Sequence, residues 1–294
     1  MRKSRIASLV AVGAISLPLL ASTASAIAAS PRAAPSIGTQ LAILKGSDTV
    51  AGDYFGFRVA ISGTTAIVGA FGHASIAGRA YVFTKTATGW KQVAELEGSD
   101  TAALDDFGSS VAISGTTAVV GADGYGNSAG RAYVFTKTAT GWKQVAELKG
   151  SDTAALDDFG ISVAISGTTA VVGADGYGNS AGRAYVFTKT ATGWRQTAEL
   201  KGSDTASLNG FGVSVAISGT TAVVSATTYG HASVIGRAYL FTKTATGWRQ
   251  TAELKASHTG LWKFVDSVAI SGTTVMVGAP SDANLAGRAY VFEA

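Results

Sequence analysis

The sequence contains no cysteine, only four prolines and only 14% charged residues. Without cysteine the fold gains nothing from disulfides, and a lipid anchor on an N-terminal cysteine is excluded. The 23 Lys and Arg residues barely exceed the 19 Asp and Glu residues and form no basic run, which argues against a nucleic-acid partner. No segment has a helical period and no glycine-rich loop precedes a helix, so phosphate-binding loop chemistry is not indicated.

The first 26 residues have the features of a signal peptide. Arg2, Lys3 and Arg5 precede an apolar stretch that ends at residue 20, and Ala24 and Ala26 mark a small-residue cleavage site. The apolar stretch is too short and too rich in small residues for a membrane-spanning helix. Residues 27–38, rich in Ala, Ser and Pro, are expected to form a disordered leader. We therefore expect a secreted, extracellular protein with no membrane span after cleavage.

What the sequence has in abundance is repetition. The phrase Ser-Val-Ala-Ile-Ser-Gly-Thr-Thr, with one variant at its first copy, occurs at 58–65, 110–117, 162–169, 214–221 and 267–274. The phrase Gly-Arg-Ala-Tyr-(Val/Leu)-Phe follows each copy, at 78–83, 130–135, 182–187, 236–241 and 287–292. A period of about 50 residues is typical of propellers and other repeat architectures, in which each unit packs only against its neighbours.

Each repeat reads as four antiparallel strands. In the second copy we expect strands at 107–113, 116–122, 131–137 and 142–148, separated by glycine-containing turns and one longer loop. The first three strands are apolar on both faces, whereas the fourth carries Lys143, Gln144 and Glu147, as an outer strand can. Four such strands make a propeller blade. The sequence therefore predicts an all-β fold, a five-bladed β-propeller over residues 39–294.

The two ends of the chain suggest how the ring closes. The sequence stops after the third strand of the fifth repeat, and residues 41–48 parallel 145–152 at the end of an outer strand. We expect this N-terminal strand to complete the last blade and remove two open sheet edges. An open array that closes by oligomerising is the alternative. We favour one closed, monomeric ring.

Two short motifs carry a resemblance to a known family. Phe-Gly occurs at 55–56, 107–108, 159–160 and 211–212, and Val-Gly-Ala follows at 68–70, 120–122, 172–174 and 277–279. This pattern resembles the FG-GAP repeat, which builds the propeller of integrin α subunits and occurs in many exported bacterial proteins. The resemblance covers residues 39–294 and implies the propeller fold, but a fold hosts many functions.

The resemblance also implies where calcium would bind, and here the sequence departs from the family. In its calcium-binding repeats an Asp/Asn-rich loop joins the first two strands, whereas this chain has Ser-Gly-Thr-Thr at that place in all five copies. Calcium takes about six to eight oxygen ligands, and this turn offers no carboxylate. We therefore expect no calcium site and no cofactor.

The loops between the second and third strands hold the candidate ligand-binding residues. Together with the loops before the first strand they should lie on one face, which the resemblance implies is the partner-binding face. The candidates are Asp123, Tyr125, Asn127, Asp175, Tyr177, Asn179, Tyr229, His231 and His73. A tyrosine at a glycine-rich loop tip suits stacking on a sugar or contact with a protein. The alternative is that these tyrosines fold back and cover the propeller.

The other polar residues have a simpler structural interpretation. Asp105-Asp106 and Asp157-Asp158 resemble paired acid–base carboxylates, but turn capping by the first Asp explains them, and we assign no catalytic residue. The three histidines, His73, His231 and His258, sit on separate loops without a metal-ligand spacing, so no metal site is expected. The arginine that begins every third strand is expected to bridge blades or bind loop carbonyls.

These patterns favour a secreted, non-catalytic binding or adhesion module for a protein or cell-surface ligand. The alternative is a multivalent lectin, for which equivalent loops in many blades would be needed, although only the second and third repeats share one loop sequence. A hydrolase would need Asp105 or Asp157 with a raised pKa in a closed pocket. A structural envelope protein without a specific ligand is the fourth hypothesis.

Overall fold

The computed structural model describes residues 37–228, 234–255, 262–263, 265, 267–280, 282 and 286–294. The chain divides into two compact units, Met1–Leu41 and Ala42–Ala294, and the strands among the described residues belong to the second. The predicted signal peptide and the leader up to residue 36 lie outside the described residues. Within the described part of the chain, no helix has the length and apolar character needed to cross a membrane.

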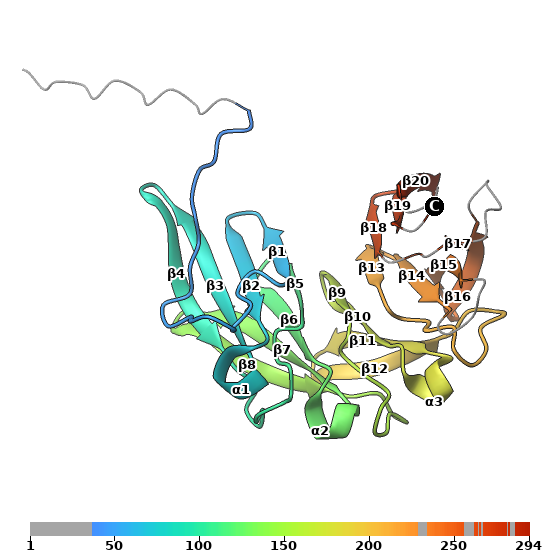
Figure 1. The fold of residues 1–294 in the computed structure, drawn as a ribbon, viewed down its shortest axis with the longest axis horizontal. Coiled ribbons are helices and arrows are strands. Elements are labelled where there is room, and N and C mark those ends of the chain that lie inside the picture. The colour runs from blue at the N-terminus through green and yellow to red at the C-terminus, as the bar shows by residue number, and fades with distance from the viewer. Residues whose placement is uncertain are drawn as a thin grey trace, which may run out of the picture. The chain divides into compact units, whose positions relative to one another are not determined.

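Five antiparallel sheets follow one another along the second unit (Figure 1). The first contains β1 (Val59–Ser62), β2 (Thr65–Ala70), β3 (Arg79–Thr86) and β4 (Gly89–Leu96); the second contains β5 (Ser110–Ser114), β6 (Thr117–Ala122), β7 (Arg131–Thr138) and β8 (Gly141–Leu148). The third contains β9 (Val163–Ser166), β10 (Thr169–Ala174), β11 (Arg183–Thr190) and β12 (Gly193–Leu200); the fourth contains β13 (Val215–Ser218), β14 (Thr221–Thr227), β15 (Val234–Thr244) and β16 (Gly247–Leu254). The last contains β18 (Ser267–Ser271), β19 (Thr274–Ala279) and β20 (Arg288–Glu293), and β17 (Trp262–Lys263) pairs in parallel with β15. We call these sheets blades 1 to 5; they confirm the predicted five-bladed β-propeller.

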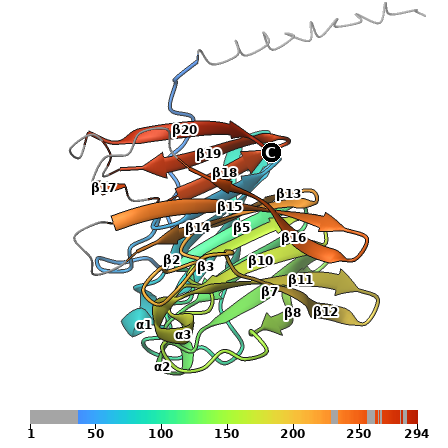
Figure 2. The same cartoon turned by 90° about the vertical axis from the view of Figure 1, so that its right-hand side faces the viewer.

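The alternation of side chains along each third strand joins the blades together. On β7, Tyr133 and Phe135 enter a hydrophobic cluster with blade 1, while Ala132 and Val134 enter a cluster with blade 3. Successive side chains of a strand point to opposite faces, so one strand packs against both neighbours. The outer-strand Trp142 contacts the first cluster, as expected for blade-to-blade packing. Figure 2 shows the same stacking for β18–β20 beside blade 4.

The serines of the repeated phrase tie each inner hairpin to the next blade. Ser110 Oγ donates to the Gly160 carbonyl at 2.6 Å, and the Gly167 amide donates to Ser114 Oγ at 3.1 Å. Equivalent bonds from Ser162 and to Ser166 join blade 3 to blade 4. The phrase therefore recurs because both of its serine hydroxyls have a partner about one repeat further on.

The Phe-Gly and Gly-Ala motifs meet where neighbouring backbones approach most closely. The Phe159 side chain is fully buried between blades 2 and 3, and Gly160 adopts φ 103°, a conformation that favours glycine. The Gly160 carbonyl oxygen lies so close to Gly121 of blade 2 that a methyl group on Gly121 would overlap it. The pairs Gly69–Gly108 and Gly173–Gly212 repeat this contact. The two motifs are the two halves of one blade-to-blade joint.

The last blade has three strands, and β20 is its edge. Residues 42–45 form no strand, so the predicted fourth strand stays a prediction. Leu44 nevertheless packs against Val68, Tyr81 and Phe83 of blade 1, just as Leu96 packs into the cluster of blade 2. The side chain of Val291 on β20 is 65% exposed, whereas its equivalents in blades 1 to 4 are buried. Leu44 thus occupies the position that Leu96 has in the next repeat, and the exposed face of β20 is where the predicted fourth strand would pair.

Replacing Gly121 with alanine is expected to destabilise the protein by on the order of 1–3 kcal/mol, because the methyl group cannot fit against the next blade. Chemical denaturation monitored by circular dichroism measures the change. Gly115→Asn is the control, because Gly115 lies in open space and asparagine tolerates its positive φ. Equal stability of Gly121→Ala and wild type would contradict the close contact between Gly121 and the Gly160 carbonyl.

The register of the complete blades predicts the register of the closing strand. Val82 pairs with Ala94 and Val134 with Ala146, so Val291 should pair with Ala42. An Ala42→Cys/Val291→Cys variant, in a chain without other cysteines, is expected to form a disulfide within one molecule on mild oxidation. Non-reducing electrophoresis at low protein concentration checks this: a disulfide-linked dimer would indicate closure by a second copy, and no bond would refute the pairing.

Candidate functional site

Three four-residue turns lie at the same end of the blades in Figure 1: α1 (His73–Ile76), α2 (Tyr125–Ser128) and α3 (Tyr177–Ser180). We call this end, with the segments leading into β1, β5 and β9, the loop face. The middle residues of the turns are left-handed, as at Gly126 (φ 61°) and Asn127 (φ 60°). The Asn127 and Ser128 carbonyls accept hydrogen bonds from the Leu156 and Asp158 amides of the next repeat. Each turn is therefore fixed by two backbone bonds to the neighbouring blade.

The loop-tip tyrosines are engaged within the protein. The Tyr125 hydroxyl donates to Asp100 Oδ2 at 2.8 Å, the Arg131 guanidinium lies 4.5 Å from its ring centroid, and the ring contacts the core cluster. Arg131 also donates to the Gly130 carbonyl, which confirms the expectation that the repeated arginine binds a loop carbonyl. Tyr177 repeats this arrangement with Asp152 and Arg183. These tyrosines fold back against the propeller, which was the alternative interpretation of the sequence.

The other predicted ligand-binding residues are distributed over the loop face. Asn127 and Asn179 are exposed, whereas Asp123 is partly buried and accepts a hydrogen bond from Ser109 Oγ. Asp175 occupies the position equivalent to Asp123 in blade 3. His73 is held by Asp53 and is discussed further below. Tyr229 and His231 lie outside the described residues.

The first aspartate of each predicted pair caps a turn, as expected. Asp105 Oδ2 accepts the Ala102 amide at 2.6 Å, and Asp157 Oδ2 accepts the Ala154 amide at 2.7 Å. Asp53 and Asn209 cap their turns in the same way. The capping role is therefore common to four repeats.

The second aspartate of each pair has an unusual electrostatic position. Burial raises the pKa of Asp106 to about 6, with further contributions from the charges of Asp123 and Asp105. Burial likewise raises the pKa of Asp158 to about 6, with Asp175 and Asp123 adding to it. The pKa of Asp123 is raised by burial although Ser109 and Arg58 oppose the shift. We call Asp106, Asp123, Asp158 and Asp175 the acidic strip; their carboxylates influence one another across blades 2 and 3.

Blade 1 has aromatic side chains at positions where blade 2 has the aspartates of the acidic strip. Tyr54 and Phe71 stack with centroids 4.9 Å apart, and Phe57 lies 4.5 Å from Phe71. Tyr54 is 63% exposed and Phe57 is 44% exposed. Arg58 covers the Phe57 ring at 4.5 Å and is close enough to Asp123 to lower the pKa of that carboxyl. We call Tyr54, Phe57 and Phe71 the aromatic cluster.

Phe71 was expected on the loop face, but Tyr54 and Phe57 were not among the residues predicted there. Tyr54, Phe57 and Phe71 stand at the positions of Asp106, Ser109 and Asp123 one period later. The signal that could have identified them is disagreement between repeats at three positions that the fold brings together. Each loop taken by itself could not reveal this disagreement, because Phe71 comes from a different loop than Tyr54 and Phe57.

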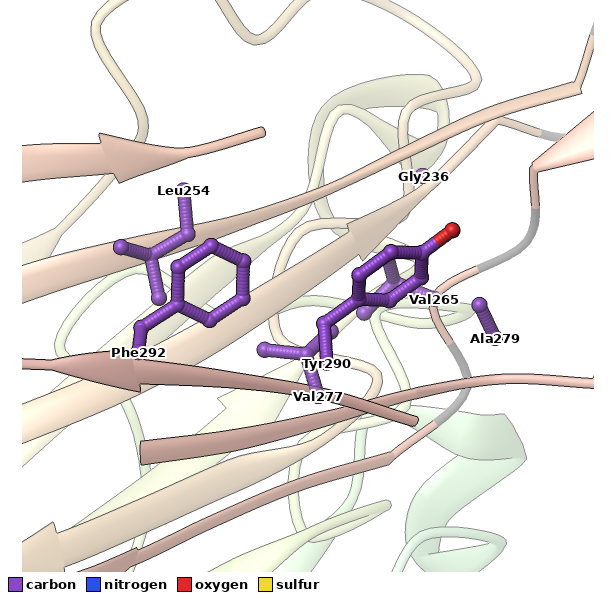
Figure 3. A pocket seen from close by; sticks show the side chains of 7 residues that line it. All are labelled: Gly236, Leu254, Val265, Val277, Ala279, Tyr290 and Phe292. Atoms are coloured by element: carbon purple, nitrogen blue, oxygen red, sulfur yellow. The ribbon is translucent and has the colours of Figure 1, made fainter. Parts of the chain in front are cut away.

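An apolar pocket between blades 4 and 5 has a structural explanation. Figure 3 shows its lining, which includes Leu254, Val277, Tyr290 and Phe292. In the preceding joint the equivalent residues Leu200, Val224, Tyr239 and Phe241 surround the buried Phe211. The sequence equivalent of Phe211 is Phe264, which lies outside the described residues. The pocket is the fifth copy of the phenylalanine slot and needs no ligand to account for it.

Comparison of the sequence with known families decides what these repeats are. The pattern of the FG-GAP repeat matches five times, at residues 39–83, 90–135, 142–187, 194–241 and 248–292. The chain belongs to the FG-GAP repeat family. Among curated proteins, none matches the sequence of this FG-GAP chain.

Solved structures similar to the FG-GAP propeller include two of Sqt1 from Chaetomium thermophilum. One, bound to the N-terminus of a ribosomal protein, is 18% identical with a TM-score of 0.48; the match covers 79% of this chain and 56% of the other. The second is 14% identical with a TM-score of 0.44, covering 82% of this chain and 70% of the other. The FG-GAP chain thus spans little more than half the length of the first.

The raised pKa values of Asp106 and Asp158 predict a pH-dependent stability. An unfolded aspartate has a pKa near 4, so between about pH 4 and 6 the folded state holds more protons than the unfolded state. Protonation of these two aspartates therefore increases the free energy of unfolding as the pH falls through 6. The increase reaches its full value below about pH 4. The Asp106→Asn/Asp158→Asn variant should be more stable than wild type at pH 7.5 and lose that advantage by pH 4.

Thermal unfolding across this pH range measures the difference. Asp105→Asn is the comparison: an amide oxygen still caps the Ala102 amide, as Asn209 caps Ala206, and only the smallest contribution to the raised pKa of Asp106 is removed, so a smaller gain at pH 7.5 is expected. A pH-independent difference between the double variant and wild type would contradict the electrostatic interpretation.

Proposed function

We propose that this FG-GAP propeller is an exported, non-catalytic module that binds a protein ligand, such as a cell-surface or matrix protein, through its loop face. The observation that carries the proposal is the exposed aromatic cluster of blade 1 beside the acidic strip of blades 2 and 3. Exposed, contiguous apolar side chains bordered by polar ones are typical of protein-binding surfaces.

The aromatic cluster supplies an anchor. Tyr and Phe are enriched at protein interfaces, and a few central aromatic residues commonly provide most of the binding energy. Tyr54 stacks on Phe71 and Phe57 packs against it at a tilt, so little side-chain entropy is lost when a ligand covers them. An apolar ligand side chain placed on this cluster would exclude water from all three rings.

The acidic strip supplies the charge preference. Asp106 and Asp158 are held partly buried next to other carboxylates, which raises the pKa of each to about 6. A ligand cation near these carboxylates would relieve their mutual repulsion. The surface therefore fits a protein segment in which an apolar side chain is flanked by Lys or Arg.

Two exposed leucines extend this surface across the loop face. Leu104 and Leu156 precede the turn-capping aspartates and adopt left-handed φ values of 74° and 70°. The Leu104 amide donates to the Ser75 carbonyl of α1, and the Leu156 amide donates to the Asn127 carbonyl of α2. A leucine fixed in this conformation with its side chain in solvent adds apolar area to a rigid binding surface.

The same geometry disfavours the lectin hypothesis. Sugar stacking needs a free aromatic face, but the Tyr125 and Tyr177 rings are covered by Arg131 and Arg183 and their hydroxyls are bound to Asp100 and Asp152. The turn-capping roles of Asp105 and Asp157 likewise support a non-catalytic function. Protein binding is the function that these contacts support best.

The proposal predicts that the mature chain binds peptides containing Leu or Trp between Lys and Arg residues, and not the same peptides with Glu in place of the cations. Fluorescence anisotropy with labelled peptides measures the affinity. The variant Tyr54→Asp/Phe57→Ser/Phe71→Asp gives blade 1 the residues of blade 2 and should weaken binding by about 30-fold or more, since hot-spot residues contribute about 2 kcal/mol each.

A matched control removes apolar surface elsewhere. Val93→Ser/Val145→Ser changes exposed valines of the outer strands β4 and β8 and should leave binding unchanged. Binding that survives the blade 1 variant, or that tolerates Glu in the peptide, would refute the proposed surface. Binding on a glycan array in place of peptide binding would support the lectin hypothesis instead.

A further inference from the structure

One position on the loop face of blade 1 differs in chemistry from its equivalents. In blades 2 and 3 a tyrosine hydroxyl, of Tyr125 or Tyr177, donates to an aspartate. In blade 1 the equivalent residue is His73, and its Nε2 lies 3.7 Å from Asp48 Oδ2. A hydroxyl donor has thus been replaced by an imidazole that faces the same carboxylate.

A buried carboxylate fixes how this imidazole presents its nitrogens. Asp53 Oδ2 lies 3.0 Å from His73 Nδ1 and also accepts the Val50 amide at 2.9 Å. A carboxylate is a hydrogen-bond acceptor, so Nδ1 of the neutral imidazole donates to Asp53 and Nε2 carries the lone pair. Carboxylate–histidine pairs of this kind orient metal-binding imidazoles.

The other potential metal ligands near His73 are two carboxylates. One ligand atom each from His73, Asp48 and Glu95 lies within 4.8 Å of the others. Two ligands bound at about 2.1 Å to one tetrahedral ion are roughly 3.4 Å apart, close to the 3.7 Å between Nε2 and Asp48. Asp48 and Glu95 are exposed; Asp48 Oδ1 accepts the Tyr81 hydroxyl at 2.7 Å and Glu95 is paired with Arg79, while Asp53 holds His73. Imidazole with two carboxylates is a donor set that suits zinc and other first-row divalent ions.

The charge around these residues provides an independent argument. In blades 2 to 4 the residue two places after the outer-strand glutamate is a lysine, Lys149, Lys201 or Lys255, but in blade 1 it is Glu97. Arg79, the repeated arginine, binds Glu97 as well as Glu95. Compared with blade 2, blade 1 therefore has the anion Glu97 in place of the cation Lys149. Glu97 also neutralises part of the charge of Arg79. Glu97 is not one of the three proposed metal ligands, but its negative charge favours the binding of a cation between them.

We propose that blade 1 binds a divalent transition-metal ion, Zn²⁺ foremost, through His73 Nε2 and the carboxylates of Asp48 and Glu95, with Asp53 orienting the imidazole. No metal site was expected from the sequence, because the three histidines were considered together. The site needs only one of them, since its other ligands come from the segment before β1 and from β4. It does not depend on the proposed protein-binding function.

Zn²⁺ binding to the full mature chain at pH 7.5, measured by competition with a chromophoric chelator, tests the proposal. Wild type should bind one ion, and Ca²⁺ should not compete because it prefers oxygen ligands. His73→Tyr installs the residue of blades 2 and 3 and should weaken binding by at least about 100-fold; Asp53→Asn should weaken it by about 10- to 100-fold. His231→Gln and His258→Gln should bind as wild type does.

A gain-of-site variant makes the test independent of any folding defect. Tyr125→His/Lys149→Glu gives blade 2 the chemistry of blade 1, with Asp100, Asp105 and Glu147 already at the equivalent positions. This variant should bind two Zn²⁺ ions. The proposal is overturned if wild type binds no Zn²⁺, or if His73→Tyr, shown to be folded by circular dichroism, binds it unchanged. Peptide binding by the Zn²⁺-site variants, which leave the aromatic cluster intact, tests the loop-face function separately.

Discussion

The structure depends on one close contact, the approach of a glycine carbonyl in one blade to a glycine Cα in the blade before it. At the pairs Gly69–Gly108 and Gly121–Gly160 a single methyl group would separate the backbones and displace the buried phenylalanine. The joint between blades 4 and 5 lacks both glycines: Ser225 and Val265 stand in their places, and Thr227 Oγ1 donates to the Val265 carbonyl instead. At this joint a hydrogen bond therefore takes the place of the glycine–glycine contact.

This constraint separates the residues that build the ring from those that give it a function. Phe, Gly and Ser recur because each has a partner about one repeat away, as in the bond from Ser110 to Gly160. Positions without such a partner are free to vary. Tyr54, Phe57, Phe71 and His73 are all of this kind and all lie in the loops of blade 1. Specificity is therefore concentrated where the repeats disagree.

The sequence predicted the strands well because apolar alternation and glycine turns are local signals. It predicted the role of Asp105 for the same reason, since a capped turn spans only three residues. It could not decide between the two roles of Tyr125, because Asp100, the carboxylate that accepts its hydroxyl, lies 25 residues earlier in the chain. The raised pKa of Asp106 was equally out of reach, because it results from burial and from Asp123 in another loop.

The divergence of blade 1 has a consequence for recognition. A ring of identical blades would offer an asymmetric ligand several equivalent orientations, and none would be preferred. Blades 2 and 3 come close to this, since Tyr125 and Tyr177 make the same contacts. The aromatic cluster breaks the equivalence on one side of the acidic strip, with Arg58 between them. In the proposed function, an apolar side chain bound there would fix which neighbouring side chains of the ligand meet Asp106 and Asp158, and so would select a single orientation.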